Sequence, residues 1–455
     1  MRAEPTSLAE LGLLPDTAGQ WPLATLLDHT HARPAHDALK RLIATPLNTI
    51  ADIEARQRLL PALATLSPQV RWSELHGLAV QVSRYLASNY VLLPTSAVER
   101  AVFALRNRDI VAELTGQLRR VDELLRQCAL LQPRLATLPN DTAFARIAFA
   151  FTNAVHDPRV ATLHAAVDRN NTNALAGLDG MVRRTITDGS WSLHAETSAI
   201  PLRDVLRALI DAIWQLDAFC SLGTASESFG GITPQLAPRD AAEVSFEGLR
   251  HPLLPQGVSN DVTLSHEERV LFLTGPNMAG KSTLLRAFGV AIYFAHLGMN
   301  VTADSAMVPL IDTLMVSITV RDNLQRGESL YLAEIRRVHT IVEAVARGES
   351  VAAIFDEVFR GTNIADATQA TALLVQGLAN APYGTFVIAS HLADVAHNST
   401  TNRGVSCWYM QVDIAGPTPL FTHRVQRGVS DVHLGMRLLD AEGVGPTLRR
   451  LAGLQ

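Results

Sequence analysis

The sequence predicts an α-helical N-terminal part followed by an α/β C-terminal part that holds a mixed, mostly parallel sheet. Three observations support this division. Between about residues 20 and 225, apolar side chains recur every three or four residues, which is the spacing of amphipathic helices. From Val244 onward, short apolar runs typical of buried strands alternate with helical stretches. The segment 223–245 is rich in glycine, serine and proline, so we expect a linker and a domain boundary there.

The helical part is best defined after Pro201, a residue suited to the first turn of a helix. The residues that follow place a set of apolar side chains on one face: Leu202, Val205, Leu206, Leu209, Ile213 and Leu216. Earlier in the chain, Leu39, Leu42 and Ile43 share a face in the same way. Because helices of this kind bury one another, we interpret most of this part as structural scaffold.

Composition indicates a soluble, cytoplasmic protein of two or three domains. The chain has 455 residues, of which 47% are hydrophobic and 18% charged, and this length exceeds one ordinary core. The first residues lack the apolar run of a signal peptide, and the weakly charged stretch 284–299 is too short to span a bilayer. Three widely separated cysteines suggest a reducing compartment and neither a disulfide framework nor a zinc site.

Five arginines in the helical part admit two interpretations: Arg106, Arg108, Arg119, Arg120 and Arg126. They could form a basic face that follows a phosphate backbone, or they could belong to an ordinary solvated helix surface, since acidic residues lie among them. The net charge of −5 does not favour a polyanion, so any affinity for DNA must come from such a local face.

A phosphate-binding loop is predicted at residues 275–283, which read Gly-Pro-Asn-Met-Ala-Gly-Lys-Ser-Thr and satisfy the pattern G-x-x-x-x-G-K-[ST]. The apolar run 270–273 predicts a buried strand before the loop, and 284–288 open a helix after it. In this arrangement several backbone N–H groups and the positive end of the helix dipole point at one anion. Lys281 is expected to reach the β- and γ-phosphates, and the Ser282 hydroxyl to complete a Mg²⁺ shell.

Two carboxylates follow a second predicted strand. Asp356 and Glu357 directly follow the apolar run 351–355. Beside a phosphate loop, the first carboxylate at such a strand end holds Mg²⁺ and the second can orient or deprotonate the attacking water. Without the loop, the pair would be read as acidic residues that close a strand.

A histidine follows a third predicted strand, 385–389. His391 could hydrogen-bond the γ-phosphate or the lytic water and so report the nucleotide state. Its alternative role is to cap the next helix.

These motifs resemble the MutS family of DNA mismatch repair proteins. Residues 274–283 are similar to the family's phosphate loop, in which Pro-Asn-Met is distinctive, and 322–334 are similar to its signature segment. Residues 356–363 resemble its Asp-Glu-Ile-Gly-Arg-Gly-Thr element, with Phe359 in place of the first glycine. Residues 420–435 resemble its C-terminal element. The interval of about 75 residues from Lys281 to Asp356 excludes the long coiled coil of chromosome-condensation ATPases.

The resemblance implies an ABC-type ATPase that uses ATP and Mg²⁺ and forms a homodimer with composite sites. Ser329 would contact the nucleotide held by the partner subunit, and His423 would pack near adenine. Where the family often stacks an aromatic side chain on adenine, this chain has Gly257-Val258-Ser259. Lys281, Glu357 and His391 would be catalytic, and Ser282 and Asp356 would hold Mg²⁺. The nucleotide would be bound by Gly275, Pro276, Asn277, Met278, Ala279, Gly280, Lys281, Ser282, Thr283, Ser329 and His423.

The helical part also resembles the family, since residues 27–33, 39–43 and 53–57 are similar to the start of its core lever domain. We therefore expect an N-terminal extension at 1–22, a lever domain at 23–228 and an ATPase domain at 240–455. Only about twenty residues precede the lever, so we expect no mismatch-recognition or connector domain. Residues 140–200 are too few for lever and full clamp, so we expect the clamp to be lost or vestigial.

The function implied is that of a DNA-binding ATPase, stimulated by DNA, that acts on DNA structure without sequence specificity and without contact with a membrane. The alternative is a dimeric, ATP-switched interaction module that moves a protein partner and does not bind DNA.

Overall fold

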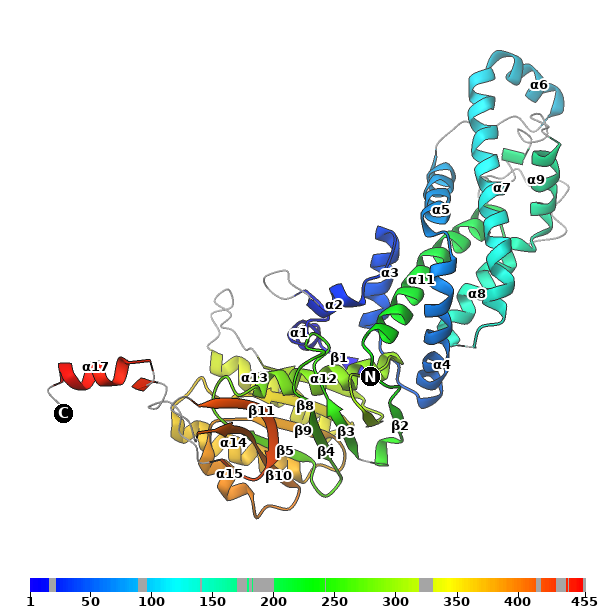
Figure 1. The fold of residues 1–455 in the computed structure, drawn as a ribbon. Coiled ribbons are helices and arrows are strands. Elements are labelled where there is room, and N and C mark those ends of the chain that lie inside the picture. Colours follow the sequence, from blue (N-terminus) through cyan, green and yellow to red (C-terminus); the bar gives the residue numbers. More distant parts are fainter. Residues whose placement is uncertain are drawn as a thin grey trace. The chain divides into compact units, whose positions relative to one another are not determined.

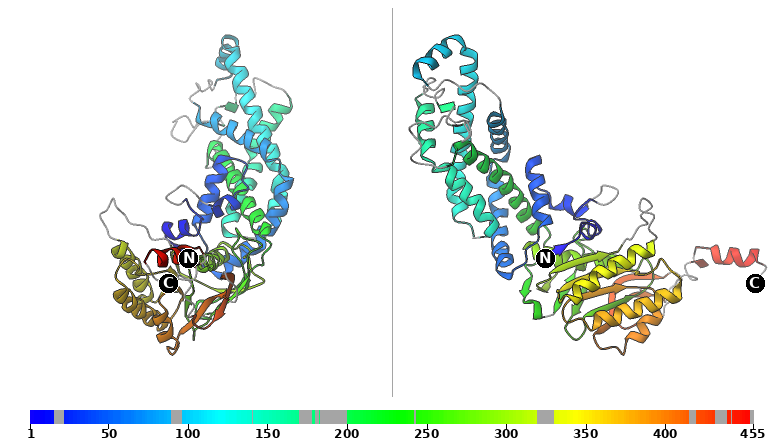
Figure 2. Two further views of the ribbon diagram at one scale, coloured as in Figure 1. Left: turned by 60° about the vertical axis from the view of Figure 1, so that its left-hand side comes forward. Right: turned by 180° about the vertical axis from the view of Figure 1, so that it is seen from behind.

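The computed structural model describes residues 1–15, 22–88, 96–139, 141–169, 178–179, 182, 200–241, 243–318, 330–414, 419–430, 439–440 and 442–452. The chain divides into two compact units (Figures 1 and 2). The helical unit comprises residues 28–44 and 58–224, and the sheet unit comprises 1–27, 45–57 and 225–455. The predicted order, a helical region followed by a mixed α/β domain, is confirmed.

The helical unit is built from long amphipathic helices around one apolar core. Fully buried side chains from different helices meet there, among them Leu63, Val82, Leu118, Phe151 and Leu209. The 27-residue helix after Pro201 begins at Leu202, as its spacing predicts. The helices are α3 (Arg33–Ala44), α5 (Trp72–Ala87), α6 (Ala97–Arg106), α7 (Arg108–Ala136), α8 (Thr142–Val155) and α9 (Pro158–Asp168), with most of α4 (Ile50–Leu66) and α11 (Leu202–Ser228).

The sheet unit contains a seven-stranded sheet with the order β1-β7-β8-β9-β5-β10-β11. All neighbouring strands are parallel except β10 and β11. Both faces of the sheet are covered, so β5 and β9 are buried along their whole length. The strands are β1 (Arg2–Ala3), β5 (Val270–Thr274), β7 (Thr313–Ser317), β8 (Val351–Asp356), β9 (Thr385–Ala389), β10 (Val405–Asp413) and β11 (Leu420–Arg427).

A smaller four-stranded sheet has the order β2-β6-β3-β4 and lies in the same unit. Its strands are β2 (Gln235–Ala237), β3 (Val244–Leu249), β4 (Asn260–Leu264) and β6 (Ser305–Pro309). The helices of the unit are α1 (Pro5–Glu10), α2 (Pro22–Leu27), α12 (Lys281–Leu297), α13 (Leu330–Ala346), α14 (Ile364–Ala379), α15 (Ala393–Ser399) and α17 (Val444–Leu451). Side chains of α13, α14 and α15 share one apolar core with β5, β8 and β9.

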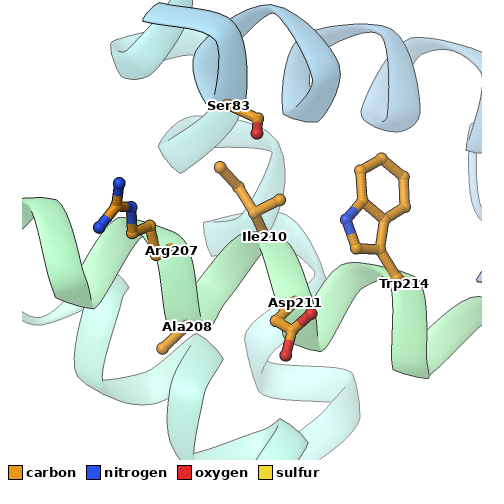
Figure 3. Close-up of a pocket in the computed structure, with 6 residues that line it drawn as sticks. All are labelled: Ser83, Arg207, Ala208, Ile210, Asp211 and Trp214. Carbon is orange, nitrogen blue, oxygen red and sulfur yellow. The ribbon is translucent and has the colours of Figure 1, made fainter. Parts of the chain in front are cut away.

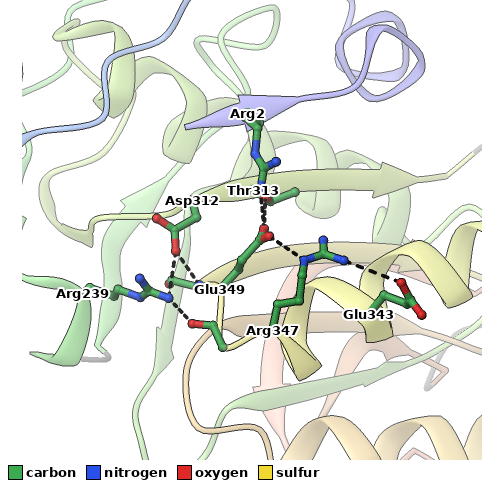
Figure 4. A network of polar contacts seen from close by, with 9 residues as sticks. Arg2, Arg239, Asp312, Thr313, Glu343, Arg347 and Glu349 are labelled. Atoms are coloured by element: carbon green, nitrogen blue, oxygen red, sulfur yellow. Dashed lines mark hydrogen bonds and ion pairs between the residues drawn. The ribbon is translucent and has the colours of Figure 1, made fainter.

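The first residues of the chain are part of the sheet unit. Strand β1 extends the large sheet by pairing with β7, and the Arg2 guanidinium forms a 2.6 Å ion pair with Glu349 (Figure 4). The Ser7 hydroxyl accepts a 2.9 Å hydrogen bond from the Val316 amide. The Glu10 carboxylate lies 2.9 Å from the Arg337 guanidinium. These contacts join residues 1–10 to β7 and α13.

The domain limits suggested by the sequence, 1–22, 23–228 and 240–455, concern functional domains and remain predictions. Within the region 140–200, residues 141–169 form α8 and α9, and most of the remainder lies outside the described residues. The loss of a clamp therefore also remains a prediction. In the part of the chain that the structure describes, no helix is both long and apolar enough to cross a membrane.

Candidate nucleotide-binding site

The loop between β5 and α12 has a backbone shape that depends on two glycines. Gly275 and Gly280 adopt φ angles of +134° and +105°, which side chains disfavour. A Cβ atom at Gly280 would lie 3.2 Å from the His423 ring, and one at Gly275 would lie 3.1 Å from Met410. Met278 also has a positive φ, +71°, and its side chain is 77% exposed. The local sequence therefore specifies the loop conformation that the motif predicts.

The Lys281 side chain is held against the same loop. Its ammonium donates hydrogen bonds to the carbonyl oxygens of Gly275, at 2.6 Å, and Pro276, at 3.2 Å. Burial lowers the pKa of Lys281, whereas the charges of Asp356 and Glu357 raise it. A cation is thus kept among carbonyl oxygens at the N-terminus of α12.

Ser282 and Asp356 lie together. The Ser282 hydroxyl donates a hydrogen bond to Oδ2 of Asp356, the last residue of β8. Burial raises the pKa of Asp356, and the hydrogen bond from Ser282 opposes this rise. The Ser282 hydroxyl and the Asp356 carboxylate are hard oxygen donors of the kind that Mg²⁺ prefers. Ionisation of the buried Asp356 is costly, and a divalent cation would stabilise its charged form.

Glu357 lies one residue beyond the strand, at a φ of +54°. Its amide donates a 2.8 Å hydrogen bond to the Ala389 carbonyl. Its carboxylate lies 3.8 Å from Nδ1 of His391 and 3.9 Å from the Arg360 guanidinium. Near the start of α15, the Ser390 hydroxyl accepts the hydrogen bond from the Leu392 amide, whereas the His391 imidazole lies beside Glu357.

One cavity of about 220 Å³ brings these groups together. Seven of the nine predicted loop residues line it, and Gly275 and Ala279 do not. The carboxylates of Asp356, the last residue of β8, and of Glu357, the next residue, complete the lining. The lining residues are Pro276, Asn277, Met278, Gly280, Lys281, Ser282, Thr283, Asp356 and Glu357.

His423 approaches the loop from β11. Its Nδ1 lies 3.1 Å from the Ala279 carbonyl oxygen. Asn260 fixes this segment, since its side-chain amide donates to the His423 carbonyl at 3.0 Å and accepts from the Val425 amide at 2.7 Å. The sequence did not suggest this role for Asn260, which the structure shows to be buried at the start of β4.

Ser329 and most of the signature segment are outside the described residues. Among the arginines, Arg126 forms 2.7 Å ion pairs with Asp122 and with Asp168.

The helical unit has a cavity of its own, with a volume of about 400 Å³ (Figure 3). In the close-up, Ile210 and Trp214 extend from α11 towards α5, which carries Ser83. The lining contains one acidic side chain, Asp211, and one basic side chain, Arg207. This cavity therefore lacks the grouped donors of the loop site.

Part of the sheet unit matches a known family model. Residues 271–448 match the family model described as MutS domain V. A DNA mismatch repair protein MutS from Thermosipho melanesiensis is 28% identical over 245 residues, which cover 53% of this chain and 29% of that protein. Proteins of the same name from Chlorobium phaeobacteroides and Chlorobaculum tepidum are 29% and 27% identical, over 51% and 52% of this chain and 27% of each relative.

The matched part of the chain spans less than a third of the length of each of these relatives. The family model begins within β5 and extends over the phosphate loop, the β8 carboxylates and His423. Residues 271–448 of this chain are therefore similar to domain V of the MutS family.

Proposed function

We propose that this protein is an ABC-type ATPase that hydrolyses ATP to ADP and phosphate and uses Mg²⁺ as its cofactor. The observation that carries the proposal is a single cavity in which the phosphate loop meets Asp356 and Glu357. A mobile cation, an oxygen pair for a metal ion and a second carboxylate are the groups that phosphoryl transfer to water requires. Lys281 would supply the cation, and Ser282 and Asp356 would supply the oxygen pair for the metal ion. Glu357 would be the second carboxylate.

The loop would bind the phosphates through its backbone N–H groups and the N-terminus of α12. The Lys281 ammonium would exchange its present partners, the carbonyls of Gly275 and Pro276, for oxygens of the β- and γ-phosphates. Ser282 and Asp356 would hold Mg²⁺, which when bound offsets the negative charge of the phosphates.

Glu357 would orient the attacking water and accept its proton. His391, 3.8 Å from that carboxylate, would hydrogen-bond the γ-phosphate and sense its presence. His423 would lie near adenine, and its contact with the Ala279 carbonyl supports this because it holds the ring against the phosphate loop.

The resemblance of the signature segment supports a homodimer with composite sites, in which Ser329 would contact the nucleotide of the partner subunit. Such a dimer should form when ATP is bound and not yet hydrolysed. We expect Glu357→Gln to sediment as a dimer in ultracentrifugation with ATP and Mg²⁺, and as a smaller species without nucleotide. A monomer under both conditions would contradict the composite site.

DNA is the proposed partner, because the relatives carry the name of DNA mismatch repair proteins. The helical unit would act as the family's lever, with contact through Arg106, Arg108 and Arg119, which are exposed on α6 and α7. Contacts of this kind follow the phosphate backbone and are indifferent to base identity. The protein would therefore respond to DNA structure rather than to a mismatched base.

The second candidate is an ATP-switched dimeric module whose helices move a protein partner. The engagement of Arg126 by Asp122 and Asp168 favours it, because one of the five arginines is already neutralised within the helical unit.

Filter binding with matched, branched and G·T-containing duplexes, with and without ATP, separates the two candidates. The DNA-binding proposal predicts affinities for matched and mismatched duplexes within about twofold, and a steep loss of affinity from low to physiological salt. Phosphate release from Mg²⁺-ATP, measured with and without duplex, tests the ATPase. Turnover without binding to any of the three DNAs would favour the protein-interaction module.

A further inference from the structure

Helix α13 presents one carboxylate on its buried face. One face of this helix carries Tyr331, Glu334, Val338 and Ile341, which lie three or four residues apart. The side chains of Tyr331, Val338 and Ile341 pack in the apolar core that includes β8. Glu334 is the fourth, and only 3% of its surface is exposed. A charged residue at such a position is costly unless its oxygens find partners.

The partners of Glu334 are backbone amides of the loop after Glu357. Its carboxylate accepts hydrogen bonds from the amides of Phe359 and Gly361 and lies near the Arg360 charge. Its second oxygen, Oε2, is buried and has no hydrogen-bond partner among the described residues. Burial raises the pKa of Glu334 despite the bonded amides. The carboxylate is thus kept at this position at a cost in stability.

The loop that Glu334 contacts has an unfavourable backbone. Glu357 and Phe359 adopt φ angles of +54° and +65°, in the left-handed region that disfavours side chains. A loop of this shape persists only when its surroundings hold it. The Phe359 ring meets the Tyr331 ring edge-on at a centroid distance of 6.3 Å, and a Cβ atom at Gly361 would lie 2.8 Å from the Tyr331 amide nitrogen.

We propose that Glu334 is a positioning residue that anchors the loop 357–361 and thereby sets the direction of the Glu357 carboxylate at the nucleotide site. This inference rests on the proposed ATPase function. Glu334 would act through backbone amides and would not touch the nucleotide, so its removal should impair turnover and leave nucleotide affinity unchanged.

The test compares two substitutions that separate shape from charge. Glu334→Gln keeps the length of the side chain and an oxygen that can accept from both amides. Glu334→Asp keeps the charge but shortens the side chain by one methylene, which moves the carboxylate oxygens away from the two amides. His339→Ala is the matched control, because His339 lies on the exposed face of the same helix with its side chain 72% exposed.

Three quantities are measured for each full-length variant: kcat for Mg²⁺-ATP, the Kd of a ribose-labelled fluorescent ATP, and amide hydrogen exchange of peptides that cover residues 357–361. Glu334→Asp should lower kcat about tenfold or more, leave Kd within about twofold, and speed exchange in the loop about tenfold. Glu334→Gln should retain kcat within about threefold, and His339→Ala should match the parent.

Two results would overturn the inference. One is a Glu334→Asp protein with the parent's kcat and loop exchange. The other is a parallel loss of kcat and nucleotide affinity with faster exchange throughout the sheet unit, which would mean a purely structural role. A parent protein that releases no phosphate would instead refute the proposed ATPase, and its loop exchange would still report whether the anchor exists.

Discussion

The two loops that line the proposed nucleotide site obtain left-handed backbone conformations in different ways. Three residues of the phosphate loop have a positive φ angle, and two of them are glycines, Gly275 and Gly280. The local sequence therefore specifies the conformation of this loop. The carboxylate loop, residues 357–361, places Glu357 and Phe359 at such angles, and neither residue favours them. Its shape is held by buried contacts from α13. One loop is therefore specified locally, and the other depends on tertiary packing.

Removal of the cation of the phosphate loop should have the largest effect. We expect Lys281→Ala to abolish nucleotide binding, with a loss of at least about a hundredfold in affinity, because no other mobile side-chain cation is expected at the β/γ position. Equilibrium binding of fluorescent ATP measures this, and melting temperature serves as the folding control. Retained affinity in a folded variant would remove Lys281 from its role.

Next in size is the effect of a methyl group in the phosphate loop. Gly280→Ala should weaken ATP binding about tenfold and lower stability by about 1–2 kcal/mol, because alanine disfavours a φ of +105° and its Cβ would meet His423. Gly116→Ala is the matched control, since Gly116 lies within helix α7 with open space around it and should gain stability. Binding titration and urea unfolding check both expectations.

The smallest effect is the difference in stability between two substitutions of Phe359, a side chain that is 6% exposed. Removal of the ring should cost about 3 kcal/mol in either Phe359→Ala or Phe359→Gly. Because glycine tolerates a φ of +65°, Phe359→Gly should be the more stable of the two by about 1 kcal/mol, the reverse of the usual order. Urea denaturation of the two variants decides this, and alanine as the more stable variant would contradict the left-handed conformation.

The sequence predicted the phosphate loop and the strand-end carboxylates because each is encoded within about ten consecutive residues, with a strand signal beside it. It also predicted the helix after Pro201 from its apolar spacing. The contact of Glu334 with the carboxylate loop was not predicted, because it joins residues about 25 positions apart on two elements. Strand β1 has two residues and therefore no periodicity, so its pairing with β7 had no local signal.

We propose that Glu357 activates water in an ATP-hydrolysing site, and single-turnover phosphate release tests this claim. Parent protein and Glu357→Gln are each mixed in excess with radiolabelled ATP and Mg²⁺, and bound nucleotide is measured in the same samples. We predict that Glu357→Gln binds ATP as the parent does and releases phosphate at least about a hundredfold more slowly. Equal rates of phosphate release from equally loaded proteins would contradict the claim.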